Sequence, residues 1–111
     1  MRSWLSSLFV AMTLGCAAAP EEAACTELTW ETYGRGYVTS WCTGCHHSAL
    51  DGALRAGAPE GVDFDQHDGV IAWLDRIESR ATGTDPTMPP VGGSDAAERA
   101  RFAGWLACGA P

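Results

Sequence analysis

Apolar and aromatic side chains recur at helical spacing in three stretches of the chain. Between positions 29 and 41 the aromatic residues lie three, four and four positions apart, on one helical face: Trp30, Tyr33, Tyr37 and Trp41. Between positions 66 and 81 one face is apolar at Val70, Ile71, Leu74 and Ile77. A last stretch, after Ser94 or Asp95, has the apolar edge Phe102, Trp105 and Leu106. The pattern predicts an all-α protein with about three main helices.

The segments between these helices are expected to form long loops. Residues 47–61 are rich in glycine and alanine, and residues 84–93 contain three prolines and two glycines, which excludes helix and central strand there. Asp65 is the expected N-cap of the middle helix, which should end near Gly83. Gly34 costs roughly 1 kcal/mol inside a helix relative to alanine, so we expect another helix to cross it closely.

The first residues have the features of an export signal. Residues 4–14 are mostly apolar, follow a positive charge and precede Gly15-Cys16. This run is too short for the ~20 residues that span a bilayer. Its end resembles a bacterial lipobox, so we expect residues 1–15 to be removed and Cys16 to be lipidated. The alternative is cleavage after residues 17–19, which would release a soluble protein.

Composition narrows the class of partner. Fourteen Asp and Glu residues oppose seven arginines and no lysine, for a net charge of −7. This balance argues against nucleic acid or an anionic membrane surface as partner, and suits solubility or docking to a basic patch. The 111 residues less the first fifteen leave 96, enough for one small domain. We expect residues 16–25 to be a tether and residues 26–111 the folded domain.

The chemistry is concentrated in one motif. Cys42, Cys45 and His46 form Cys-x-x-Cys-His, the pattern through which a c-type haem is covalently attached. Thiols at i and i+3 lie on one side of a helical turn, so both can reach one porphyrin edge, and His46 follows as the proximal iron ligand. Its other ring nitrogen should bond a carbonyl near residues 57–59. The same letters also fit a redox dithiol or half of a zinc site.

Other candidate residues lie far from this motif in the sequence. Met88 sits in a proline-stiffened loop that could hold it against a metal at little entropic cost, or it fills a gap in the core. Cys25 and Cys108 remain for a disulfide, which export permits, or are free thiols. His67 is expected to be solvated, and is the reserve second ligand for iron. Four arginines could neutralise haem propionates, with no sequence signal to choose among them: Arg35, Arg55, Arg76 and Arg80.

The order of these features resembles a small class I type cytochrome c domain. The likeness covers residues 29–107: helix, Cys-x-x-Cys-His, loop, helix, Met-Pro-Pro and C-terminal helix. It implies the cytochrome c fold, with the first and last helices crossing at Gly34, and Met88 as the distal ligand. The family has an aromatic residue four positions before the first cysteine, where this chain has Val38; either Tyr37 substitutes for it or the crossing is shifted.

The resemblance implies an electron carrier rather than an enzyme. One covalent haem c, ligated by His46 and Met88, would exchange single electrons with redox protein partners. The whole chain also resembles bacterial cytochrome-type lipoproteins, which implies the periplasm or cell envelope, with a lipid anchor on Cys16. Two alternatives stay open: a haem-based catalyst or gas sensor whose distal ligand is labile, and a zinc-binding structural module.

Overall fold

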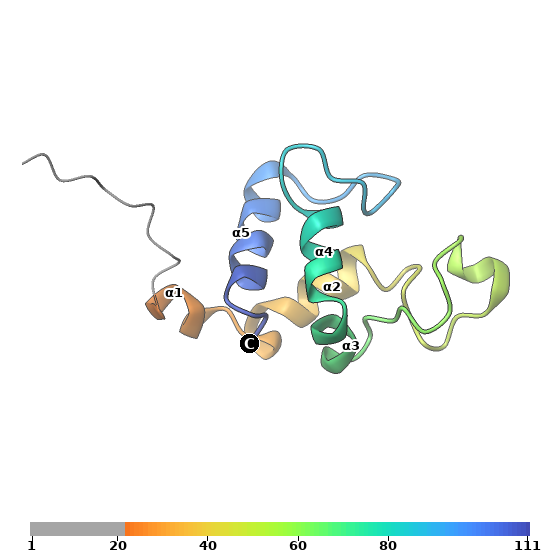
Figure 1. Ribbon diagram of the computed structural model, residues 1–111, viewed down its shortest axis with the longest axis horizontal. Coiled ribbons are helices and arrows are strands. Elements are labelled where there is room, and N and C mark those ends of the chain that lie inside the picture. Colours follow the sequence, from red (N-terminus) through yellow and green to blue (C-terminus); the bar gives the residue numbers. More distant parts are fainter. Residues whose placement is uncertain (1–21) are drawn as a thin grey trace, which may run out of the picture.

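The computed structural model describes residues 22–111 (Figure 1). Across this range all regular structure is helical and no strand occurs, which confirms the all-α class. The predicted export signal and the lipidation site at Cys16 lie outside the described residues. Among the residues that the structure describes, no helix has the length and apolar character needed to cross a membrane.

The first predicted helix has two parts. A π-helical turn, Trp30–Gly34, leads directly into α2, Arg35–Trp41. Thr29 caps the turn, because its side chain accepts a hydrogen bond from the Thr32 backbone N–H and the Thr32 hydroxyl accepts one from the Thr29 backbone N–H. Upstream lies the short helix α1, Glu22–Glu27, in a segment that the sequence assigns partly to the tether.

The middle helix is broken where the sequence predicts one continuous element. It forms α3, His67–Ala72, and α4, Leu74–Ala81, because Trp73 between them leaves helical geometry with φ −113° and ψ 16°. The predicted N-cap is also wrong, since Gln66 occupies that position without a side-chain cap. Asp65 instead accepts hydrogen bonds from the backbone and hydroxyl of Ser48.

The last helix follows the sequence prediction closely. α5 spans Ala96–Ala107, and the Asp95 side chain caps it by accepting a hydrogen bond from the Glu98 backbone N–H at 2.8 Å. α5 packs beside α4 (Figure 1). Between the elements, the predicted loop 47–61 contains one 3₁₀ turn, Gly52–Arg55, and residues 84–93 contain neither helix nor strand.

The core is centred on the crossing of α5 with the first helix. The Tyr37 ring stacks on Phe102 with centroids 4.0 Å apart, and its hydroxyl bonds Ser94 at 2.8 Å. Tyr37 thus packs against the last helix, next in sequence to the buried Val38. A Cβ atom on Gly34 would lie 2.2 Å from the Trp105 ring, which confirms the close crossing at this glycine. The buried apolar residues are Tyr37, Val38, Phe64, Val70, Ile77, Ala81, Phe102, Trp105, Leu106 and Ala110.

The two ends of the domain are tied together. Cys25 and Cys108 form a disulfide, which confirms the predicted pairing and joins α1 to the end of α5. His67 belongs to the same region: its ring stacks on Trp30 with centroids 5.0 Å apart, and its Nε2 atom lies 2.7 Å from the Ala110 carbonyl oxygen. The expectation that His67 is a solvated residue is therefore wrong, because it packs at the C-terminal end.

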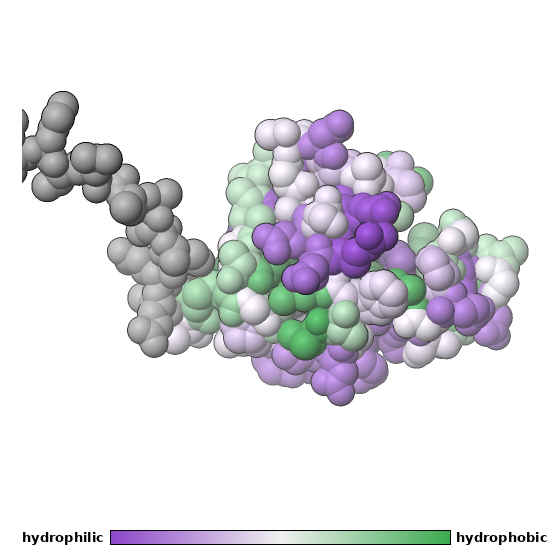
Figure 2. All heavy atoms as spheres, in the orientation of Figure 1, coloured by the Kyte–Doolittle hydropathy of each residue, from purple (hydrophilic) through white to green (hydrophobic). Residues whose placement is uncertain are grey.

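Hydrophilic residues cover much of the face of the molecule that is shown in Figure 2. Figure 2 shows them over α4 and around α3, with smaller apolar areas between. This hydrophilic surface agrees with the net charge of −7.

Replacing Gly34 with alanine should destabilise the fold. The new methyl group would overlap the Trp105 ring, and overpacking of a well-filled core costs about 1–3 kcal/mol. Gly36→Ala is the matched control, because Gly36 is an exposed position of α2 and a Cβ there meets nothing within 4 Å. The control should be neutral or stabilising by up to about 1 kcal/mol. Denaturant unfolding of both variants measures the difference, and equal effects would contradict the crossing.

Candidate functional site

One cavity of about 590 Å³ brings together the residues that the sequence singles out. Cys42, Cys45, His46 and Met88 all contribute to its lining, although Met88 lies 42 positions from His46 in the chain. The volume falls within the range of roughly 300–1,000 Å³ that is typical of pockets for small molecules and cofactors. Chain topology therefore converges on a single hollow beside the motif.

The walls of the cavity are mostly apolar. Aromatic, aliphatic and proline side chains supply the surface: Tyr37, Trp41, Pro59, Val62, Phe64, Trp73, Ile77, Ala81, Pro89 and Pro90. Two cations, Arg76 and Arg80, also line it. An apolar hollow with a few placed polar groups is the usual form of a cofactor site.

The cysteine pair is positioned by the end of α2. The Cys42 N–H donates to the Val38 carbonyl at 2.8 Å and so continues the helical ladder. The chain then turns, with the backbone N–H groups of Cys45 and His46 both donating to the Cys42 carbonyl oxygen, at 3.2 and 3.0 Å. Neither Cys42 nor Cys45 is in a disulfide. The turn therefore presents two free thiols and the following imidazole at one cavity.

The His46 ring is oriented by two contacts. Its Nδ1 atom lies 2.8 Å from the Val62 carbonyl oxygen, and its face stacks on Phe64 with centroids 4.6 Å apart. A carbonyl oxygen can only accept, so Nδ1 carries the proton and Nε2 of the neutral ring keeps its lone pair. The expected carbonyl near residues 57–59 is thus wrong by a few positions, since the loop extends further before it returns to the ring.

Met88 is held by backbone bonds to the end of α4. The N–H groups of Thr87 and Met88 both donate to the Arg80 carbonyl oxygen, at 2.8 and 2.9 Å. This carbonyl lies in the last turn of α4, where no further helical N–H is available to it. The Met88 side chain is 38% exposed, so it lines the cavity and also reaches solvent.

The structure separates the four arginines that the sequence leaves equivalent. Arg76 and Arg80 line the cavity. Arg35 pairs with Glu31 on an exposed helix surface. Arg55 is buried and bonded to the loop around His46, a role that sequence reasoning misses. Its only sequence signal is that it is the one cation in a loop rich in glycine and alanine.

The two remaining histidines do not join the cavity lining. His67 is engaged at the C-terminal end, as described above. The His47 Nδ1 atom accepts a hydrogen bond from the Ala49 backbone N–H at 3.1 Å and lies 3.9 Å from an Asp65 carboxylate oxygen. Bonds from the Ser48 hydroxyl and backbone hold the pKa of Asp65 below its ordinary value.

Within residues 22–111, no three His, Cys, Asp or Glu side chains group to hold a metal ion.

Comparisons with known proteins give no relative: no protein-family model, curated protein or solved structure matches this chain.

Cys42 should be a slow nucleophile in the folded chain whose thiols are both free. Burial raises the pKa of this thiol from 9.0 to about 12, so little reactive thiolate forms at pH 9. We expect iodoacetamide to modify Cys42 at least about tenfold more slowly in buffer than in denaturant, as read by peptide mass spectrometry. Equal rates in the two conditions would contradict the buried position.

The same shift sets the sign of a pH effect on stability. Above pH 9.0 the unfolded chain releases the Cys42 proton while the folded chain keeps it. The unfolded state then binds fewer protons, so the free energy of unfolding falls as pH rises from 9.0 toward about 12. Cys42→Ala should reduce that slope. Denaturant titrations at pH 8 and pH 10 give the comparison.

Proposed function

We propose that this chain is a monohaem c-type cytochrome, built on the cytochrome c fold, that carries single electrons between redox proteins. The observation that carries the proposal is the convergence of Cys42, Cys45, His46 and Met88 on one apolar cavity. The first three form the attachment motif, and Met88 comes from a separate loop to supply a sulfur atom.

The residues present fit a covalently bound haem. Cys42 and Cys45 would form the two thioether bonds, and His46 Nε2 and the Met88 sulfur atom would be the axial ligands. Nε2 is the ring nitrogen left free by the bond from Nδ1 to Val62. The cavity of about 590 Å³ has the size and apolar walls that a flat, largely apolar macrocycle needs. When bound, the haem would supply reversible one-electron chemistry at its iron.

The protein's own groups would set the conditions for that chemistry. Apolar walls such as Phe64 and Ile77 would give the haem a surrounding of low polarity. Arg76 and Arg80 would neutralise the propionates, because both line the cavity and neither has another ion pair among the described residues. A methionine ligand raises the reduction potential relative to a second histidine. Exposure of Met88 at 38% marks a side of the cavity through which electrons could reach a partner.

Charge indicates the kind of redox partner. The chain carries a net charge of −7, and long-range attraction favours a partner with a basic docking patch. Such association would weaken as salt is added, because exposed charges are screened.

A haem-based catalyst or gas sensor is the second candidate function. The observation that favours it is the position of Met88, which is partly exposed and lies on a loop outside any helix. A ligand on such a loop can leave the iron more readily than one on a packed helix. A zinc module has less support, because zinc requires about four protein ligands and no such group occurs among residues 22–111.

The decisive spectroscopic prediction concerns Met88. The matured protein should be red and six-coordinate low-spin, and its reduced form should not bind carbon monoxide, because both axial positions are filled. Met88→Ala should open one position, change the spectrum and allow carbon monoxide to bind.

Val91→Ala is the matched control, since Val91 lies on the same loop and is exposed. It should leave the spectrum unchanged. A red wild-type protein that binds carbon monoxide readily would favour the catalyst or sensor. A colourless protein, matured in cells with haem-attachment machinery, would exclude haem altogether.

We further propose that the chain is exported and anchored in the bacterial cell envelope through lipid on Cys16. Protein purified from its native export route should begin at Cys16 and show the added lipid in its intact mass. Cys16→Ser should lose that mass and leave the detergent phase in a phase-separation assay, whereas Ala17→Ser should keep both properties. A wild-type chain that begins after residues 17–19 and partitions into water would contradict the anchor.

A further inference from the structure

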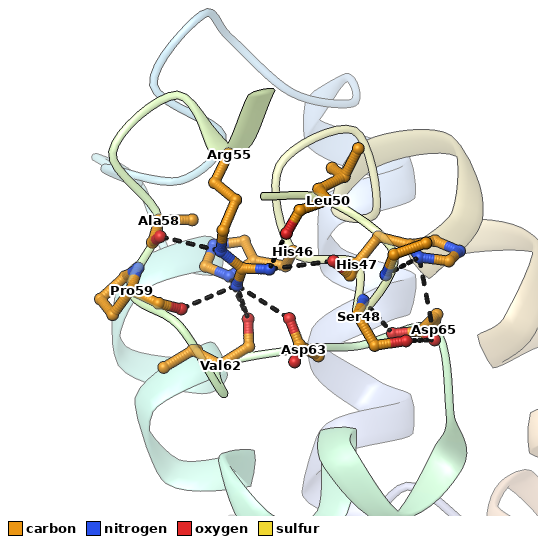
Figure 3. Close-up of polar contacts among 11 residues, drawn as sticks. His46, His47, Ser48, Leu50, Arg55, Ala58, Pro59, Val62, Asp63 and Asp65 are labelled. Carbon is orange, nitrogen blue, oxygen red and sulfur yellow. Dashed lines mark hydrogen bonds and ion pairs between the residues drawn. The ribbon is translucent and has the colours of Figure 1, made fainter. Parts of the chain in front are cut away.

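Arg55 is the one charged side chain that is buried within the described part of the chain, at 2% exposure. Its guanidinium nitrogens donate to five backbone carbonyl oxygens at 2.7 to 3.3 Å, those of His47, Leu50, Ala58, Pro59 and Val62 (Figure 3). Asp63 adds an ion pair at 2.8 Å. Arginine has five N–H donors, so these contacts engage all of its hydrogen-bonding capacity.

This burial needs an explanation beyond stability. Removing an ionised group from water costs several kcal/mol, which its partners offset only in good geometry. A well-packed apolar side chain is often an equal or better stabiliser at such a position. All of the carbonyl partners lie between residues 47 and 62, the loop that follows His46. The guanidinium therefore ties together the segment that follows His46 and that bonds its ring through Val62.

The Val62 carbonyl oxygen connects Arg55 to His46 directly. It accepts from Arg55 Nη2 at 3.2 Å and from His46 Nδ1 at 2.8 Å. Figure 3 shows the guanidinium beside the His46 ring, with both groups directed at this part of the loop. One backbone oxygen is thus shared between a permanent cation and the imidazole that is proposed to bind iron.

We propose that Arg55 is a positioning residue for His46, which fixes the ring through the Val62 carbonyl and raises the reduction potential at the site. This inference rests on the proposed haem function. A carbonyl oxygen that already accepts from a guanidinium draws less strongly on the Nδ1 proton. The imidazole then has less imidazolate character and donates less electron density through Nε2, which disfavours iron(III) relative to iron(II).

The same contacts exclude Arg55 as a partner of the haem propionates. With its donors directed at the loop and 2% of its surface exposed, it has no N–H left for a ligand. Arg76 and Arg80 remain for that role, because they line the cavity. The cations near the site therefore divide into one that acts through the backbone and two that face the cavity.

Arg55→Lys tests the shared carbonyl while keeping the charge. A lysine cannot reproduce the planar fan of donors, so Val62 should bind the Nδ1 proton more strongly. We expect the equilibrium constant for one-electron reduction of iron(III) to iron(II) by a mediator to fall about tenfold, which is 59 mV for one electron. Arg35→Lys is the control, since Arg35 is exposed and paired with Glu31, and it should leave the potential unchanged. An unchanged potential in Arg55→Lys would overturn the inference.

Asp63→Asn provides a second variant that keeps Arg55 in place. Loss of the ion pair leaves the positive charge of the guanidinium uncompensated, so Arg55 should draw more strongly on the Val62 carbonyl oxygen. That oxygen should then bind the Nδ1 proton of His46 less strongly, and the reduction potential should rise. Asp51→Asn removes the same charge from an exposed position in the same loop and should raise it much less. Equal changes in the two variants, or a fall in Asp63→Asn, would contradict the role of Arg55.

A nuclear magnetic resonance measurement on the purified full-length chain separates this inference from the proposed function. The Arg55 guanidinium protons should exchange with water at least about tenfold more slowly than those of Arg35, and His46 should carry its proton on Nδ1, whether or not haem is present. Fast exchange at Arg55 would overturn the inference even in a red protein. Protected Arg55 protons in a protein that carries no porphyrin would support the role of Arg55 in ordering the loop but would contradict the proposed haem function.

Discussion

The hydrogen bond from His46 Nδ1 to the Val62 carbonyl oxygen is the contact on which the site depends. It fixes the tautomer of the ring, because a carbonyl oxygen can only accept a hydrogen bond and the proton must therefore be on Nδ1. Nε2 is then the free nitrogen. The Phe64 N–H returns to the His46 carbonyl oxygen at 2.9 Å, so residues 62–64 contact both the ring and the backbone of this histidine. A change in the loop that moved Val62 would therefore change the chemistry that the imidazole can perform.

The sequence predicts well the features that are set by local chemistry. The Asp95 cap, the loop around Met88 and the helical face that begins at Trp30 each follow from residue types within a few positions. The close helix crossing at Gly34 is predicted from the cost of a glycine inside a helix. The structure shows the reason for the glycine, because a side chain there would overlap the Trp105 ring. These successes share one cause: each depends on periodicity or on the conformational preference of single residues.

The failures involve partners distant in sequence or the shape of a loop. His67 contacts the carbonyl of Ala110, 43 positions away. No pattern of residues near His67 predicts that the C-terminal residues pack beside it. The acceptor for His46 is Val62 and not a residue of 57–59, because the path of a long loop with few periodic positions is not encoded locally. The role of Arg55 is the feature that the sequence conceals most completely. Its five hydrogen-bond acceptors are backbone carbonyls, which are present at every position and therefore give no signal in the side-chain sequence.

The size of the cavity bears on the stability of a domain this small. A chain of about 100 residues has little apolar surface to bury, and here the aromatic core lies on one side, at the crossing of α5 with the first helix. Trp41 and Trp73 instead line the cavity and remain exposed, although large aromatic side chains contribute most when fully buried. A flat apolar group in the cavity would cover the surfaces of these rings that face it. On this argument the proposed haem would complete the hydrophobic core of the domain, and its covalent attachment would make that part of the core permanent.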